Sequence, residues 1–417
     1  MHSLSESILD SATTSEIDRF ASEHEPAWIA YRRERHCSPE PSGEETETSH
    51  SVCERLKSLG IEAAIPDRGV GVVGDLLLGS ATPETPAIAV RADIDALRMT
   101  DRKEVGYASI KPELAHACGH DAHTTVVLSV AEILAHLNRQ QKKADRSTLN
   151  ARIRFLFQSA EETGEGALWM VQDGYLRDVQ SILGLHVEPN LLAGQIGIRY
   201  GVFTAQVDEI TLCIRGRGGH TARPHSTTDP IHCGCQLVTT LYQFLPRSID
   251  VRDAAVFSVG EFHAGHASNV IPDEVTIVGT LRTTSHESRE DLLRRIRETC
   301  DHFAQLTGNE IEVQVGHSLG SVVNSDRETR AMETAAESVV GADAVTILDR
   351  PSMGGEDFAA YLTECKGCQI RLGCAGSLPW PHLHSPVFDI DESAIAIGAR
   401  VIARAALELG GRLPTSG

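Results

Sequence analysis

Three histidines and one cysteine fall within eight residues of this chain, at positions 116–123 (HACGHDAH). Cysteine sulfur and imidazole nitrogen are ligands that zinc and its first-row neighbours prefer. Cys118 and His120 lie two positions apart, so on extended backbone both side chains would point the same way. We interpret the stretch as part of a metal site whose other ligands come from elsewhere. The alternative is a histidine-rich loop around a buried thiol.

Two adjacent carboxylates, Glu161 and Glu162, follow a strand expected at residues 153–157. At the end of a strand, one carboxylate can bind a metal ion while its neighbour reaches a water molecule, a division of labour that hydrolytic metal sites need. The glycines in residues 163–166 (TGEG) indicate a loop that a ligand can approach closely. An acidic helix start in solvent explains the pair equally well.

Two further histidines are candidate ligands. His186 ends a strand expected at residues 181–185, and His384 lies between two prolines in residues 381–386 (PHLHSP). A histidine at the end of a buried strand is usually a structural one, and a turn between prolines can lie on the surface without a function. Each of the two is therefore a weak signal when it is taken alone.

The middle of the chain carries a second polar set. Residues 218–225 (GGHTARPH) are glycine-rich and basic and contain His220 and His225. Asn269 lies in an expected turn, and Arg282 ends an expected strand. Such side chains could hold an anionic substrate or stabilise an oxyanion. A turn-forming asparagine and a surface arginine are the alternative interpretation.

Alternating strands and helices must position these residues. The first half of the chain predicts helices at residues 3–35, 44–59, 124–137 and 168–175, a polar linker at 138–150, and strands at 87–90, 153–157 and 181–185. This alternation is typical of a mainly parallel sheet with helices on both faces. In such sheets the binding crevice lies outside the carboxyl ends of the strands. Asp93, Glu161, Glu162 and His186 all fall at such ends.

The pattern changes near residue 200. Strands expected at 208–215, 254–262, 274–282 and 311–315 alternate with helices at 229–245 and 288–306, which is the β-α-β-β-α-β order of a ferredoxin-like unit. The prediction is a mixed α/β catalytic domain with an inserted α+β lid. Its first part is residues 1–200, the lid is residues 201–316, and its second part is residues 317–417.

Composition limits the partners. The formal net charge of −20 argues against nucleic acid or an anionic membrane as a partner, because phosphate contacts need a basic face. No apolar run approaches the length of a membrane span. The first 35 residues are polar and acidic and do not resemble a secretory leader. Ten cysteines in 417 residues are too few for a disulfide scaffold. We expect a cytoplasmic protein.

Taken together, the motifs resemble one family. In order they are residues 91–97 (RADIDAL), 116–123 (HACGHDAH), 157–162 (FQSAEE), 184–186 (GLH), 218–220 (GGH) with 224–225 (PH), 269–273 (NVIPD), 355–358 (GEDF) and 384–386 (HSP). The series is similar to the metal-dependent amidohydrolases and metallopeptidases that include aminoacylases, hippurate hydrolase, auxin-conjugate hydrolases and certain carboxypeptidases. The resemblance covers about residues 36 to 400.

The resemblance implies a role for each matching residue. The implied metal ligands are Cys118, His120, Glu162, His186 and His384. Glu161 becomes the general base and acid. The implied substrate or transition-state contacts are His220 or His225, Asn269 and Arg282, with His220 favoured as the oxyanion partner. Asp93, Asp95 and Asp121 would position imidazoles. The resemblance also implies one or two divalent ions, zinc or manganese, and a homodimer or larger homo-oligomer assembled through the lid.

Departures from the family pattern leave the substrate open. Members usually have PAEEGG where this chain has residues 159–164 (SAEETG), and Glu165 adds another carboxylate. The expected reaction is attack of a metal-activated water on an sp² carbon that bears nitrogen. The favoured substrate is an N-acyl or N-aroyl amino acid or a similar small carboxylate. The alternatives are hydrolytic deamination of an activated aromatic amine such as a nitroanthranilate and, more remotely, an inactive binding protein.

Overall fold

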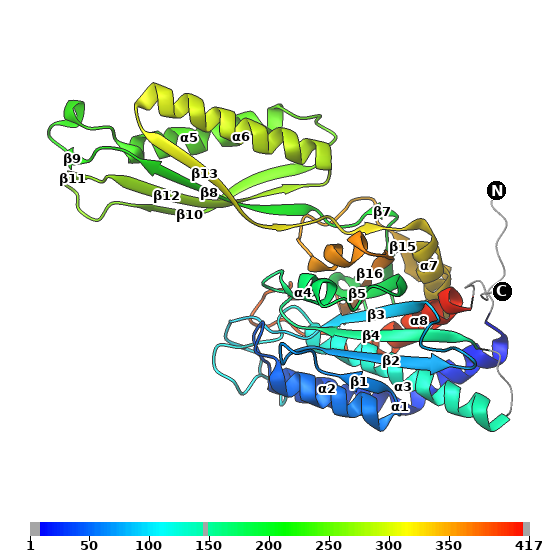
Figure 1. Cartoon of the computed structure of the whole chain (residues 1–417). Helices are drawn as coiled ribbons and strands as arrows, with labels where there is room; N and C mark the ends of the chain where they lie inside the picture. Colours follow the sequence, from blue (N-terminus) through cyan, green and yellow to red (C-terminus); the bar gives the residue numbers. More distant parts are fainter. Residues whose placement is uncertain (1–8, 145–148, 412–417) are drawn as a thin grey trace. The chain divides into compact units, whose positions relative to one another are not determined.

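The computed structural model describes residues 9–144 and 149–411 and divides into two compact units (Figure 1). Unit 1 contains the chain up to Gly201, then Val323–Asp349 and the chain from Asp357 onward. Unit 2 contains Val202–Val322 and the short segment Arg350–Glu356. Unit 1 is therefore discontinuous in sequence, with unit 2 inserted into it.

A large sheet forms the centre of unit 1. Within the described residues its eight strands follow the order β1-β2-β4-β3-β5-β16-β6-β15. Their bounds are β1 Glu62–Ala64, β2 Val72–Leu78, β3 Ala87–Asp93, β4 Ala151–Gln158, β5 Val179–Leu192, β6 Ile196–Ile198, β15 Val345–Ile347 and β16 Lys366–Ala375. The central strands β4, β3, β5 and β16 run parallel, whereas β1, β2 and β6 add antiparallel pairs. The predicted mixed, mainly parallel sheet is confirmed.

Burial explains why these segments form central strands. Every residue of β3 and of β4 is buried, as expected for parallel strands covered on both faces. Helices α3 (His120–Ala144) and α8 (Ser393–Gly410) pack against the strands, and α1 (Ser11–Cys37) packs on α3 and α8. The other helices of unit 1 are α2 (Thr46–Ser58), α4 (Gly166–Gln172) and α7 (Asp326–Val340), with 3₁₀ turns η3 (Ala342–Ala344) and η4 (Asp357–Thr363).

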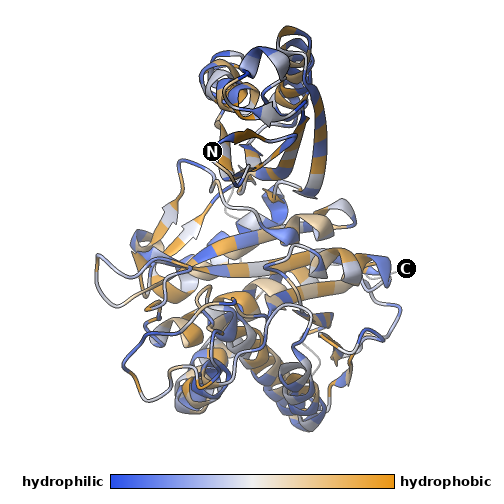
Figure 2. Ribbon diagram, turned by 90° about the vertical axis from the view of Figure 1, so that its left-hand side faces the viewer, coloured by the Kyte–Doolittle hydropathy of each residue, from blue (hydrophilic) through white to orange (hydrophobic). Residues whose placement is uncertain are grey.

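Unit 2 has the predicted β-α-β-β-α-β order. Four antiparallel strands follow the order β10-β12-β8-β13, and two helices, α5 and α6, cover the sheet (Figure 1). The bounds are β8 Gln206–Arg215, α5 Pro230–Phe244, β10 Ala255–Ala264, β12 Glu274–Thr283, α6 His286–Thr307 and β13 Glu310–Leu319. Buried residues alternate along β12, and orange and blue bands alternate on the strands in Figure 2. This is the pattern of a sheet with one face on a helix layer.

Short elements complete the chain. They are β7 (Gly201–Val202), β9 (Gly219–His220), η1 (Pro224–Ser226), η2 (Leu245–Arg247), β11 (Val270–Ile271) and β14 (Val323–Asn324). In unit 2, Asp229 caps α5 by accepting from the backbone N–H groups of Ile231 and His232, and Gly308 ends α6 in a left-handed conformation.

The predicted bounds of three segments need correction: the helix at 124–137, the linker at 138–150 and the strand at 181–185. The predicted helix 124–137 begins earlier, at His120, and continues to Ala144. Arg139, Gln140, Lys142 and Lys143 favour helix and stay exposed on its last turns. Residues 145–148 of the predicted linker and residues 3–8 of the predicted first helix lie outside the described residues. Strand β5 extends to Leu192, well beyond the predicted end at residue 185.

None of the helices in the described parts of the chain combines the length and the apolar composition that crossing a bilayer requires.

Candidate metal centre

Cys118 and His120 converge at the start of helix α3, but not by the geometry expected from extended backbone. Gly119 between them has φ +84°, and His120 is the first residue of α3. A Cβ atom on residue 119 would lie 2.5 Å from Cγ2 of Val187. Only glycine fits both the left-handed conformation and this close approach. A tight glycine turn therefore brings the thiol and the imidazole together, and the extended-backbone interpretation is wrong.

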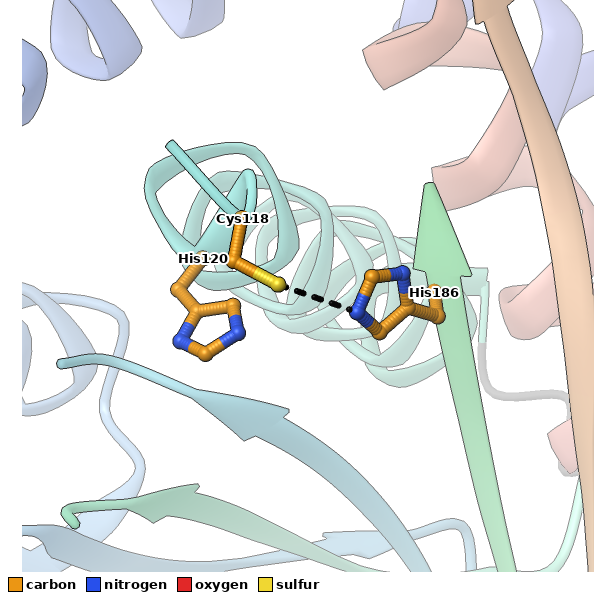
Figure 3. Close-up of side chains that lie close together, drawn as sticks. All are labelled: Cys118, His120 and His186. Carbon is orange, nitrogen blue, oxygen red and sulfur yellow. Dashed lines mark hydrogen bonds between the residues drawn. The ribbon is translucent and has the colours of Figure 1, made fainter. Parts of the chain in front are cut away.

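His186 brings a second imidazole to the same thiol. Its Nε2 lies 3.4 Å from Sγ of Cys118, and Figure 3 shows both side chains and His120 around one point. One ligand atom of each of the three residues lies within 4.8 Å of the others, and all three residues are buried. His186 lies inside β5 rather than at its end. It nevertheless lies beyond Leu183, the last residue at which β5 pairs with β3, so the strand is already leaving that neighbour.

Glu162 and His384 form a second group with Cys118. Nε2 of His384 lies 3.7 Å from Oε1 of Glu162, and ligand atoms of the three residues again lie within 4.8 Å of one another. His384 has φ +61°, and its backbone N–H donates to the carbonyl of Ala117 at 2.8 Å. Its side chain is 55% exposed, whereas that of Glu162 is 13% exposed. These two groups of three share Cys118, so together they could hold two neighbouring metal ions.

Glu161 lies beside these groups. Its Oε2 is 3.8 Å from Nε2 of His120, and Oε1 of Glu162 is 3.9 Å from the same nitrogen. Both carboxylates follow β4 in a compact loop in which Ala160 has φ +54°. The left-handed residue turns the chain so that two consecutive side chains reach one region. The adjacent pair predicted to flank a metal is therefore assembled at the predicted strand end.

Hydrogen bonds fix which nitrogen of each histidine is available. His120 donates from Nδ1 to Oδ1 of Asp95 at 3.0 Å, and His186 donates from Nδ1 to the carbonyl of Val187 at 2.8 Å. Each imidazole therefore directs Nε2 toward the site, where this nitrogen would be the lone-pair donor to a metal ion. The other oxygen of Asp95 accepts from the backbone N–H of Glu162 at 2.9 Å. One carboxylate thus orients a histidine and a glutamate that are both candidate ligands.

His123, the third histidine of the sequence motif, has no nitrogen left for a metal. Its Nε2 accepts from the backbone N–H of Val187 at 2.9 Å, which requires the proton to be on Nδ1. Nδ1 then donates to Oδ1 of Asp93 at 2.6 Å. Arg91 donates to the other oxygen of Asp93 at 2.6 Å. His123 and Asp93 therefore hold the residues around the ligand groups in position and are not themselves candidate metal ligands.

The buried atoms of the centre fit a cation. Among the described residues, Nε2 of His120 and Oε1 of Glu162 are buried without a hydrogen-bond partner. Burial raises the pKa of the Cys118 thiol well above its usual range. Burial opposes protonation of His120, but the charge of Asp93 raises its pKa well above the ordinary value. A divalent ion would take the place of both protons and satisfy the orphaned atoms, which is how metal sites release protons on loading.

Asp121 orients a different histidine from the candidate ligands. Its Oδ2 accepts from Nε of Arg32 at 2.6 Å and from Nδ1 of His36 at 2.7 Å. Arg32 also donates to Asp389 at 2.8 Å, in the loop that follows His384. Through Arg32, helix α1 therefore connects the start of α3 to the loop that contains His384 and Asp389. Sequence reasoning did not select Arg32 or His36, because neither belongs to a motif with ligand spacing.

The four polar residues of unit 2 divide between two ends of its sheet. His220 and Val270 pair in the β9–β11 ribbon, so Asn269 lies next to His220, and His225 follows in η1. Arg282 lies near the other end of β12 and donates to the carbonyl of Met353 at 2.7 Å. The eight-residue advance along β12 from Glu274 to Arg282 corresponds to roughly 25 Å. The structure brings His220 and Asn269 together, but it does not bring Arg282 to them.

Comparison with known proteins gives the class. A family model described as "Peptidase family M20/M25/M40" matches residues 89–408. This chain belongs to that family. Because its homologues are amidohydrolases and peptidases, the protein is a hydrolase that acts on C–N bonds. The family resemblance expected from the ordered motifs is confirmed, and membership of a family of hydrolases favours an enzyme over the more remote alternative, an inactive binding protein.

Individual relatives show the range of the family. An N-acetyl-L-cysteine deacetylase of Bacillus subtilis is 35% identical over 88% of this chain and 84% of its own length. The IAA-amino acid hydrolase ILR1-like 4 of Arabidopsis thaliana is 34% identical over 89% of this chain and 83% of its own length. The Bacillus subtilis YXEP protein, a dinuclear metal-binding peptidase of the M20 family, superposes with a TM-score of 0.80 at 30% identity and covers 94% of this chain and 99% of that chain.

Proposed function

We propose that the protein hydrolyses the amide bond of N-acyl or N-aroyl amino acids, or of a similar small carboxylate, at a centre of divalent metal. The observation that carries the proposal is the pair of ligand groups that share Cys118, with the Glu161 carboxylate beside them. The deacetylase and conjugate-hydrolase relatives support this substrate class, because both names describe amide cleavage next to an amino acid.

The proposed ligands divide into two sets. Cys118, His120 and His186 would hold one ion, and Cys118, Glu162 and His384 would hold a second. A thiolate and imidazoles suit zinc, while the carboxylate also suits manganese, so metal analysis of the purified protein is needed to choose between them. A bound divalent ion supplies a Lewis acid and brings the pKa of water toward neutrality.

Glu161 is the proposed proton carrier. Its carboxylate takes a proton from the attacking water as the water oxygen forms a bond to the amide carbon. The same carboxyl group then delivers that proton to the departing nitrogen, so that the C–N bond breaks and a carboxylic acid and an amine are produced. Asp95 keeps the lone pair of His120 Nε2 directed into the site, and it holds the Glu162 amide next to Glu161.

Unit 2 is the proposed lid and the route to assembly. His220 and Asn269 would contact the substrate, with His220 as the oxyanion partner and His225 as the second choice. Because Arg282 lies at the other end of the same sheet, one lid cannot present all three side chains to one small substrate. A homodimer or larger homo-oligomer formed through unit 2 would remove this conflict by letting two lids contribute. That assembly and a cytoplasmic location remain predictions.

The proposal is tested with Glu161→Gln against a matched control. Glutamine keeps the shape of the side chain but cannot carry the proton, so kcat for N-acetyl amino acids should fall by about 100- to 10,000-fold, while metal content is kept. Glu165→Gln changes an exposed carboxylate of the same loop and should leave kcat within about twofold of wild type. A Glu161→Gln enzyme with a near-normal rate would remove Glu161 from the mechanism.

A panel of substrates distinguishes amide hydrolysis from the alternative reaction, hydrolytic deamination of an aromatic amine. Wild-type enzyme is incubated with a panel of N-acyl amino acids and with nitro-substituted anthranilates, and free amine and ammonia are measured. Amide cleavage without ammonia from the anthranilates is the expected result. Ammonia release from a nitroanthranilate, without cleavage of any acyl amino acid, would replace the proposed function by hydrolytic deamination.

A further inference from the structure

The loop between α1 and α2 lies outside the segment that the family model matches, yet it reaches the surroundings of the metal centre. The match begins at residue 89, whereas α1 ends at Cys37 and α2 begins at Thr46. In this loop Glu40 accepts from the backbone N–H of Thr48 at 2.7 Å, and so holds the start of α2. Ser42 donates to Oδ2 of Asp95 at 2.7 Å. The loop therefore makes polar contacts both to the start of α2 and to Asp95.

Glu45, at the end of this loop, is completely buried. Its Oε1 accepts from the backbone N–H of Ala160 at 2.8 Å, and its Oε2 is buried without a hydrogen-bond partner among the described residues. A buried carboxyl group with one oxygen left unpaired opposes folding, because the lost hydration of that oxygen is not replaced. Glu45 does not serve general stability well, so its contact with Ala160 needs another explanation.

Ala160 is held in an unfavourable conformation. Its φ of +54° lies in the left-handed region, which an alanine occupies only at a cost in free energy. Around it the chain is very compact. The backbone N–H groups of Glu165 and Gly166 both donate to the carbonyl of Ala160, and a Cβ atom on Gly166 would lie 1.6 Å from the carbonyl oxygen of Ser159. Contacts on both sides of this peptide therefore maintain the strained turn.

The strained turn places Glu161 between two fixed amides. On one side the Ala160 N–H donates to Glu45, and on the other the Glu162 N–H donates to Asp95. Backbone relaxation at Ala160 to a negative φ would rotate the chain at the residue that precedes Glu161. The side chain whose Oε2 now lies 3.8 Å from Nε2 of His120 would then point elsewhere.

We infer that Glu45 is a positioning residue for Glu161, because its carboxyl group holds the Ala160 amide in the left-handed turn that directs Glu161 toward His120. The inference rests on the proposed function in so far as Glu161 moves the proton. It assigns Glu45 an effect on turnover rather than on substrate binding, since its side chain accepts from the Ala160 amide and Glu45 belongs to none of the ligand groups found among the described residues. The N-terminal segment then contributes to the rate through one buried hydrogen bond.

Glutamine is the informative replacement. Burial, with a further contribution from the charge of Asp95, raises the pKa of the Glu45 carboxyl to about 7. A neutral glutamine keeps the shape and one oxygen acceptor for the Ala160 N–H, so Glu45→Gln should preserve the turn. Methionine has a similar size but offers no such acceptor, so Glu45→Met removes the hydrogen bond without leaving a cavity.

The first measurement is independent of catalysis. Amide hydrogen exchange of the full-length protein is followed at Ala160. Slow exchange is expected in wild type. In Glu45→Met the exchange should be at least about tenfold faster, because one buried hydrogen bond is lost. Glu45→Gln should exchange like wild type. Fast exchange of this amide in wild type would overturn the inference without the use of any variant, which covers the case in which Glu45→Met does not fold.

The second measurement uses turnover of an N-acetyl amino acid. Glu45→Met should lower kcat by about 10- to 100-fold through misplacement of Glu161, with KM and zinc affinity, measured by calorimetry, within about threefold of wild type. Glu44→Gln is the matched control, because Glu44 is exposed and pairs with the exposed Arg98. It should change neither exchange nor kcat.

A double variant separates positioning from general destabilisation. Glycine occupies the left-handed region without cost, so Ala160→Gly combined with Glu45→Met should recover part of the lost kcat. Equal kcat in Glu45→Met and wild type, or an equal loss in the single and double variants, would overturn the inference. If wild type cleaves no acyl amino acid, the proposed function fails, while hydrogen exchange at Ala160 still decides whether Glu45 holds the turn.

Discussion

Replacement of Gly119 by alanine should damage the metal centre by two separable effects. At φ +84° an alanine costs about 1–2 kcal/mol relative to glycine. Its Cβ would also lie 2.5 Å from Cγ2 of the buried Val187, and overpacking of this kind costs about 1–3 kcal/mol. The sum is about 2–5 kcal/mol. Because Val187 follows His186, relief of the clash would move His186 away from Cys118.

Thermal unfolding of the metal-free protein measures this loss. At about 2–4 °C per kcal/mol for a unit of this size, Gly119→Ala should lower the unfolding midpoint by at least about 4 °C. Gly60→Ala is a matched control, since Gly60 has φ +79° and no atom within 4 Å of an added Cβ. Gly60→Ala should lower the free energy of unfolding only by the cost of placing alanine in the left-handed conformation, about 1–2 kcal/mol.

A double-mutant cycle isolates the clash. Val187→Ala removes the methyl group that the new Cβ meets, so Gly119→Ala with Val187→Ala should be less destabilised than the sum of the single variants by about 1–3 kcal/mol. The double variant should also regain zinc affinity relative to Gly119→Ala. If Gly119→Ala is no less stable than Gly60→Ala, or if the two substitutions at 119 and 187 are additive, the steric reasoning is refuted.

Two further predictions concern charge and metal. Burial opposes ionisation of Asp75, but its hydrogen bonds from Arg154 and Arg152 hold the pKa of Asp75 below its usual 3.8. A carboxyl group whose pKa is lower in the folded than in the unfolded state contributes stability at pH values above its unfolded pKa. This contribution is lost as the pH falls through the folded-state pKa. Asp75→Asn should therefore cost about 1–3 kcal/mol at pH 7, and its difference in melting temperature from wild type should shrink below pH 4; a constant difference would contradict the assignment. Removal of metal with a chelator should abolish turnover, and addition of zinc or manganese should restore it with release of protons from Cys118 and His120. Proton release is measured in a weakly buffered titration, and metal-independent turnover would exclude the proposed centre.

The sequence was informative where chemistry is concentrated in short motifs. The residue types at 116–123 and the adjacent pair Glu161–Glu162 identified most of the candidate centre, since ligand chemistry depends on residue type. The alternation of strands and helices was enough for the mixed sheet and the ferredoxin-like unit. Patterns that span whole elements made this possible: continuous apolar runs in the buried strands β3 and β4, and alternation of period 2 in strands such as β12.

Other features could not be predicted, because they depend on contacts between distant segments. Nothing local distinguishes Arg32 or Glu45 from other charged residues near a helix end, yet each is buried against a partner 89 or 115 positions away. The roles of individual histidines are equally non-local. His123 is excluded as a ligand only by the backbone N–H of Val187, which a sequence pattern does not contain. The left-handed turn at Gly119 likewise replaces the extended geometry that spacing suggested.

The order of the strands in the large sheet has a consequence for the nascent chain. Strand β16 lies between β5 and β6, although it is made only after the whole of unit 2. During synthesis the amino-terminal strands must therefore wait with one edge of β5 uncovered, while unit 2, apart from a short segment, can already fold as a continuous stretch. An unpaired inner edge is prone to associate with other chains, so we expect folding of this protein in the cell to depend on chaperones.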